Sequence, residues 1–101
     1  AQGRGIERDP GEAARWYRQA ADRDSAEAMN NLAIAYAAGE GVASDPVEAF
    51  RWFTLAAERL PQGETRSQAE GNRTRVAALL TPAEREAALR LVREWRAQPA
   101  R

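Results

Sequence analysis

Few residues in this chain have side chains that could do chemistry. Two carboxylate pairs have the residue types that general acid–base catalysis uses. They are Asp9 with Glu12, and Asp45 with Glu48. Hydrolysis of a glycosidic bond needs two such groups about 5–9.5 Å apart in a cleft, one of them with a raised pKa. The sequence has no His and no Cys, which removes the commonest general base, the commonest metal ligand and the thiolate nucleophile. We therefore expect a protein that is not an enzyme, with no catalytic residue, metal ligand or cofactor.

A second candidate for chemistry is the Gly-x-Gly motif of Gly39 and Gly41. A phosphate-binding loop of this kind follows a strand and opens a helix. Here the segment before the motif has helical spacing, so we interpret the glycines as a turn between two helices. Gly39 is expected to be the left-handed cap of the first helix, and Gly41 to permit the tight return of the chain. Val42 is expected to fill the gap between the two helices.

The carboxylate pairs also have a local structural use, because they stand where helices begin. Three tetrapeptides place a capping oxygen first, a proline second and a glutamate fourth, which is the pattern of a capping box. They are Asp9–Glu12, Asp45–Glu48 and Thr81–Glu84, and Asp24–Glu27 repeats the pattern without the proline. These signals predict helices near 10–23, 26–38, 46–59 and 82–97.

The apolar residues of these segments recur at helical spacing, which predicts the faces that form the core. The stripe in 46–59 is Ala49, Trp52, Phe53, Ala56 and Ala57, and the stripe in 26–38 is Ala28, Leu32, Ala35, Tyr36 and Gly39. A thinner stripe predicts a fifth helix between 63 and 80, with Arg73 at its edge. We interpret the aromatic stripe as core rather than as a platform for stacked bases.

The segment 3–23 is repeated at 39–59, exactly one period of 36 residues later in the chain, and 11 of the 21 aligned positions are identical. A fixed period of this length is typical of repeat proteins, in which each unit buries its apolar face only against its neighbours. Trp16 and Trp52 therefore occupy equivalent positions. We predict that Trp52 is well buried, and that Trp16 is less buried unless an upstream helix or another chain covers it.

The repeated pattern resembles the Sel-one-like repeat. The residues that carry the resemblance are Ala28-x3-Leu32-Ala33-x2-Tyr36-x2-Gly39-x-Gly41-Val42-x2-Asp45-x2-Glu48-Ala49-x2-Trp52-Phe53-x2-Ala56-Ala57. The resemblance implies an all-α fold, an α/α superhelical solenoid of antiparallel helix pairs related to tetratricopeptide repeats. Within one domain, 1–101, it implies a partial repeat at 1–23 without its first helix, a complete repeat at 24–59, and C-terminal capping helices at 60–101 like those of bacterial members.

The function that the resemblance implies is a scaffold or adaptor that binds a protein or peptide partner. In related solenoids the first helix of each unit lines a groove, which here carries over to Glu27, Asn30, Asn31, Ile34 and Ala38. Asparagine amides both donate to and accept from a main chain, although Asn31 could equally bond the backbone of a neighbouring helix. A second contact is expected at the open N-terminal end, where the unit lacks its first helix, through Ala13, Trp16, Tyr17 and Ala20.

The charge of the chain limits the other partners. It has 15 Arg, no Lys and 15 acidic residues, and 23 residues are Ala, a bias that we attribute to a GC-rich bacterial genome. Residues 1–59 have a net charge of −3 and residues 60–101 of +3. We expect no nucleic-acid partner, and no membrane insertion because no apolar run approaches about 18 residues. The alternatives that remain open are nucleic-acid binding by the Arg-rich second half and a hydrolase-related accessory role at the cell envelope. Localisation is left between bacterial cytoplasm and periplasm.

Overall fold

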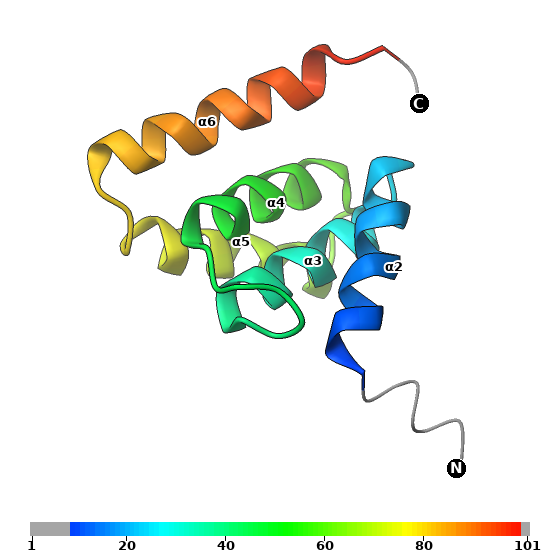
Figure 1. Ribbon diagram of the computed structural model, residues 1–101. Coiled ribbons are helices and arrows are strands. Elements are labelled where there is room, and N and C mark those ends of the chain that lie inside the picture. The colour runs from blue at the N-terminus through cyan, green and yellow to red at the C-terminus, as the bar shows by residue number, and fades with distance from the viewer. Residues whose placement is uncertain (1–8, 100–101) are drawn as a thin grey trace.

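The computed structural model describes residues 9–99, and every regular element in this range is a helix (Figure 1). The helices are α2 (Pro10–Asp22), α3 (Ala26–Ala38), α4 (Pro46–Arg59), α5 (Glu64–Ala77) and α6 (Pro82–Ala97). The predicted bounds are confirmed for α3, α4 and α6, and α2 ends one residue earlier than expected. The fifth helix, α5, lies inside the predicted range of 63–80.

Side chains cap the helix starts, but most of them do not form the complete capping box that the sequence predicts. Asp9 accepts a hydrogen bond from the Glu12 N–H at 3.1 Å, and Asp45 accepts two from the first turn of α4. Among the helix starts of residues 9–99, the reciprocal bond to the glutamate forms only at α6, where the Thr81 N–H donates to Glu84. At α4 the Asp45 N–H instead donates to the Tyr36 carbonyl at 3.0 Å, so that donor is already satisfied without Glu48.

The start of α3 corrects the prediction by one residue. Ser25, not Asp24, is the N-cap, and its hydroxyl accepts from the Ala28 N–H at 3.2 Å. Asp24 has φ 70°, and its N–H donates to the carbonyl of Ala21. Asp24 is therefore part of the turn that leaves α2, because a left-handed residue cannot take the extended conformation of an N-cap.

The helices pack in chain order around α4. In Figure 1, α3 to α6 run back and forth in alternating directions, and α2 crosses the end of this stack. Helix α4 packs against α3, α5 and α6, whereas α2 packs mainly on α3. This sequential arrangement is consistent with the expected helical-repeat fold.

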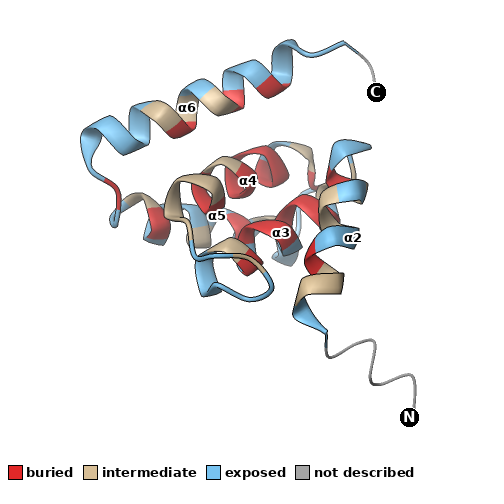
Figure 2. Ribbon diagram, viewed as in Figure 1, coloured by how far each residue is buried: buried red, intermediate tan, exposed pale blue. Residues whose placement is uncertain are grey.

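Burial follows from the number of neighbours that each helix has (Figure 2). Helix α4, between three others, buries eight of its 14 residues, including Phe50 and Leu55, which lie outside the predicted stripe. Helix α6 buries only Ala88, Val92 and Trp95, which lie on one side of the helix, and α5 buries Ala69 and Val76 while Arg73 is exposed.

The Gly-x-Gly segment is a turn that contacts α2. Gly39 has φ 71° and is the left-handed C-cap of α3, as predicted, and Gly41 has φ 78°. A Cβ atom on Gly41 would overlap the carbonyl of Pro10. The turn therefore packs directly on the first residues of α2, and a side chain at position 41 is excluded both by sterics and by backbone conformation.

Candidate functional site

The carboxylates that could have done chemistry are used to build helix ends and ion pairs. Asp9 and Asp45 are N-caps, as described above. Glu12 pairs with Arg15 at 3.0 Å and Glu48 pairs with Arg51 at 2.8 Å, so the same i,i+3 ion pair recurs one period apart. Within residues 9–99 no three His, Cys, Asp or Glu side chains are placed to hold a metal ion, and no helix of this range is long and apolar enough to cross a membrane.

The two equivalent tryptophans have opposite environments. Trp52 is 1% exposed and Trp16 is 62% exposed, as the repeat predicts. The ring of Trp52 lies edge-to-face on Trp95 at a centroid distance of 5.0 Å, and its Nε1 donates to Glu48 at 3.1 Å. The guanidinium of Arg51 lies 4.3 Å from the centre of the same ring. Trp52 thus joins α4 to α6, while Trp16 faces solvent.

The same contrast extends to the neighbours of the tryptophans. Ala49, Phe53 and Ala56 of α4 are buried. Their equivalents in α2 are only partly buried. We call the side of α2 that carries Ala13, Trp16, Tyr17 and Ala20 its open face. Trp16 is exposed there, whereas Tyr17 and Ala20 are partly buried against the core. This face is less covered than its equivalent on α4 because α2 packs mainly on one helix and α4 packs on three.

A groove of about 310 Å³ runs between α2 and α3, beside the open face. It is lined by Pro10, Ala13, Tyr17, Asn31, Ile34, Ala35 and Glu40. The structure thus brings together two residues of the predicted groove, Asn31 and Ile34, with two of the predicted end contact, Ala13 and Tyr17. The side chain of Asn31 is exposed and makes no hydrogen bond within residues 9–99, so its amide is available to a ligand.

The remaining predicted residues lie elsewhere. Asn30 is only 9% exposed and its Oδ1 has no hydrogen-bond partner within the described chain. Its side chain points into the packed interior, so we do not include it in the candidate surface. Glu27 and Ala38 are exposed, but neither lines the α2–α3 groove. Trp16 and Ala20 belong to the open face outside the groove.

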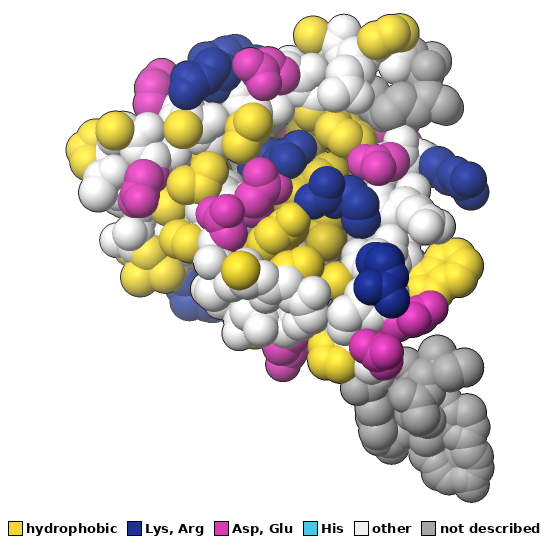
Figure 3. Space-filling view, viewed as in Figure 1, with side chains coloured by type: hydrophobic (Ala, Val, Ile, Leu, Met, Phe, Trp, Pro, Cys, Tyr) yellow, Lys and Arg dark blue, Asp and Glu magenta, His cyan; other side chains and the backbone are white. Residues whose placement is uncertain are grey.

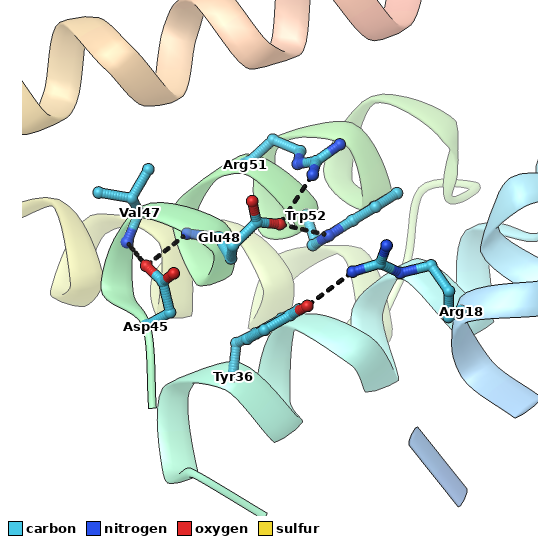
Figure 4. Close-up of polar contacts among 7 residues, drawn as sticks. All are labelled: Arg18, Tyr36, Asp45, Val47, Glu48, Arg51 and Trp52. Carbon is cyan, nitrogen blue, oxygen red and sulfur yellow. Dashed lines mark hydrogen bonds and ion pairs between the residues drawn. The ribbon is translucent and has the colours of Figure 1, made fainter. Parts of the chain in front are cut away.

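A second hollow, which the sequence reasoning missed, lies on the other flank of α2. We call it the Arg18 pocket. It has a volume of about 340 Å³ and is lined by Gly11, Ala14, Arg15, Arg18, Gln19, Leu32, Tyr36, Gly41 and Val42. Arg18 reaches across it and donates to the Tyr36 hydroxyl at 2.6 Å (Figure 4). The one available signal in the sequence is that Arg18 breaks the repeat, since the equivalent residue 36 positions later is Thr54.

Figure 3 shows how charged and hydrophobic side chains are distributed over one face of the molecule. Charged side chains of both signs lie across a hydrophobic area in the middle of the view. Four arginines of residues 60–99 have local partners, two of which are carboxylates and two neutral oxygens. Arg66 pairs with Glu70 and Arg96 pairs with Glu58, while Arg75 and Arg85 donate to Asn72 and to the Ala77 carbonyl.

Comparison with known proteins identifies the family of this chain. The model of the Sel1 repeat matches residues 1–25 and 26–59, which together are 59 of the 101 residues (25 + 34). No curated protein and no solved structure matches the chain. The boundary between the two matches falls at the cap of α3, and the second match ends with the last residue of α4.

Proposed function

This chain belongs to the Sel1 repeat family, and from that premise we propose that it is a non-catalytic scaffold module that holds a partner polypeptide against α2. Sel1 repeats generally mediate protein interactions. The partner in this proposal covers the open face of α2 and enters the α2–α3 groove.

The observation that carries the proposal is the exposure of Trp16 at a position whose equivalent is fully buried. A tryptophan buries about 150–250 Å² when it is covered. At about 25 cal/mol per Å², covering the exposed 62% of Trp16 is worth about 2–4 kcal/mol. Tryptophan is also among the residues that most often dominate binding energy at protein interfaces. Covering Trp16 would therefore contribute enough free energy for the open face to act as a contact surface.

The groove supplies the polar complement. Ile34 is 40% exposed and offers an apolar contact, while Asn31 offers an amide that can donate to and accept from a partner's main chain. An apolar lining with a few placed polar groups is the usual composition of a binding cleft. We infer that the apolar side chains of the partner rest on Trp16 and Ile34, and that its backbone bonds to Asn31.

We also propose the unit boundaries on which this surface depends. Residues 24–59 are the complete repeat, 1–23 are the second half of a preceding unit, and 60–101 are a C-terminal cap. The outward side of α6 supports the cap, because a terminal unit needs a polar outer face. All of its charged residues there are exposed: Arg85, Glu86, Arg90, Arg93 and Glu94.

The proposal is tested by site-specific photo-crosslinking. A photoreactive amino acid is placed at position 16, at position 34 or at position 79 of the full chain in cells that produce it. Leu79 is the matched control, because it is an exposed hydrophobic residue remote from α2, at the end of α5. We expect one protein to crosslink from positions 16 and 34 and not from 79.

The partner identified in this way is then purified and its affinity measured. Trp16→Ala is expected to weaken binding by at least tenfold, which is about 1.4 kcal/mol, and Leu79→Ala to leave it unchanged. Binding that is insensitive to both Trp16→Ala and Ile34→Ser would contradict the proposal.

A further inference from the structure

The Arg18 pocket contains a guanidinium that forms no ion pair within residues 9–99. We propose that it binds a carboxylate of the partner, an Asp or Glu side chain within an acidic segment. The inference rests on the proposed scaffold function and adds the chemistry of the partner to it.

The ion pairs around the pocket include the neighbouring arginines but not Arg18. Arg15 is paired with Glu12 and Arg51 is paired with Glu48, so these four residues cancel. None of the ion pairs within residues 9–99 includes Arg18. Arg18 is therefore the arginine of this pocket that has no carboxylate partner in the described chain.

The hydrogen bonds of Arg18 lead to the same conclusion. Its hydrogen-bond acceptor in the described chain is a neutral group, the Tyr36 hydroxyl, and its Nε is buried without a partner there. A buried charge is costly unless it is paired and hydrogen-bonded. Because the Tyr36 oxygen accepts from Arg18, its own hydrogen is free to donate. Arginine and tyrosine thus present donors from two helices to one anionic group.

The fold itself does not need an arginine at this position. The guanidinium of Arg18 lies 5.8 Å from the centre of the Trp52 ring, but Arg51 already covers that ring at 4.3 Å (Figure 4). At the equivalent position of the next unit the packed residue is Thr54, which is buried. The charge of Arg18 is therefore an addition to the repeat, not one of its structural requirements.

The shape of the pocket suits a side chain on an extended segment. Its floor is apolar, formed by Ala14, Leu32 and Val42, and Arg15 and Gln19 stand at its edge. A planar guanidinium binds a carboxylate through two parallel N–H donors. The methylene stem of a glutamate would lie on the apolar floor while its carboxylate reaches Arg18 and Tyr36.

The experiment is an NMR titration of the isotopically labelled full chain. The probe is a heptapeptide with blocked ends and four glutamates, and the control probe has glutamine at the same four positions. The signals followed are the Arg18 Nε–H and the Trp52 Nε1–H. We expect both to shift saturably with the glutamate peptide only, and the affinity to fall as salt is raised from about 0.05 to 0.3 M.

Variants locate the effect. Arg18→Gln is expected to weaken binding at least tenfold, and Tyr36→Phe several-fold, since it removes only the hydroxyl donor. Arg93→Gln is the control, because Arg93 is exposed on α6 and its loss changes the net charge equally. Circular dichroism establishes that each variant is folded. If Arg18→Gln is unfolded, the affinities of Tyr36→Phe and Arg18→Lys for the glutamate peptide are the test. Arg18→Lys is expected to bind more weakly than the original protein because an ammonium group lacks the planar fork of a guanidinium.

Three results would overturn the inference. Glutamine and glutamate peptides could bind alike, Arg93→Gln could weaken binding as much as Arg18→Gln, or inorganic phosphate could move the same signals at lower concentration than the peptide. The last would assign the pocket to phosphate. The crosslinks from Trp16 test the scaffold separately, because the open face lies on the other flank of α2. Crosslinking that persists without binding of the acidic peptide would refute only the carboxylate site.

Discussion

Trp52 shows how much one residue contributes when several helices meet on it. It contacts Trp95 of α6, the Arg51 guanidinium and the Glu48 carboxylate. Its indole N–H would lose its acceptor in any apolar replacement, and its removal would leave a cavity between α4 and α6. Trp16 has the same position in its unit, but most of its surface is already in water.

We expect Trp52→Ala to lower the free energy of unfolding by about 3–5 kcal/mol, and Trp16→Ala to lower it by no more than about 1 kcal/mol. Urea unfolding followed by circular dichroism measures both. Equal losses in the two variants would contradict the assigned environments, because they would require Trp16 to be packed as Trp52 is.

Alanine should have opposite effects on stability at a glycine in a turn and at a glycine inside a helix. Gly41→Ala is expected to destabilise the protein by about 1–3 kcal/mol, because position 41 has positive φ and abuts the Pro10 carbonyl. Gly71→Ala is the matched control. Position 71 lies inside α5, and the nearest atom that an added Cβ would meet is on the Arg75 side chain of the next turn, at 3.9 Å. Gly71→Ala is therefore expected to stabilise the protein by about 0.5–1 kcal/mol. Thermal unfolding of the two variants should shift in opposite directions.

At the scale of the element, helix starts depend on single oxygens. Asp45 accepts from both Val47 and Glu48, and such a cap is worth about 1 kcal/mol. The structure assigns the cap of α3 to Ser25 and places Asp24 in the preceding turn. Asp24 makes a different contact, a partly exposed ion pair with Arg59, at 3.8 Å between Oδ1 and Nε.

We therefore expect Asp45→Ala and Ser25→Ala each to cost about 1 kcal/mol in the free energy of unfolding. Asp24→Gly should cost about half of that or less, since glycine tolerates the positive φ of this position and exposed ion pairs contribute little. Urea titration of the three variants is the measurement. A larger loss at Asp24 than at Ser25 would restore the capping box that the sequence pattern predicts.

At the scale of the whole molecule, the uncovered side of α2 is the clearest asymmetry. The period of 36 residues makes it possible to build a neighbour for α2 from the chain itself. A copy of residues 24–38 placed directly before Gly3 has the register in which 24–38 precedes Gly39. If the open face of α2 is the equivalent of the covered face of α4, this copy should pack on it.

The extended protein is expected to be more stable by about 2–4 kcal/mol, from the burial of Trp16 and Tyr17. Its tryptophan fluorescence should shift to shorter wavelength, since Trp16 would leave water. A control copy with serine at its apolar positions should produce neither change. Light scattering establishes that both proteins are monomeric, and an unchanged stability in a monomer would refute the predicted covering of α2.

What the sequence determined by itself is the part of this structure that depends on short-range interactions. A cap bonds to a residue two or three positions away, so Asp9, Asp45 and Thr81 mark the starts of their helices without reference to the rest of the chain. The 36-residue period and the apolar stripes likewise predicted the repeat, the fold class and the different burial of Trp16 and Trp52.

Tertiary structure alone decided which surfaces are available. Asn30 and Asn31 are adjacent and chemically identical, yet one is buried and the other is exposed beside the groove, because α3 lies between α2 and α4. Phe50 and Leu55 are buried because α4 has three neighbours. Arg18 is one of 15 arginines in the sequence. It is distinguished only by its position over Trp52, its bond to Tyr36 and the absence of an ion pair to it within residues 9–99. Such contacts join residues far apart in the chain, and no local pattern encodes them.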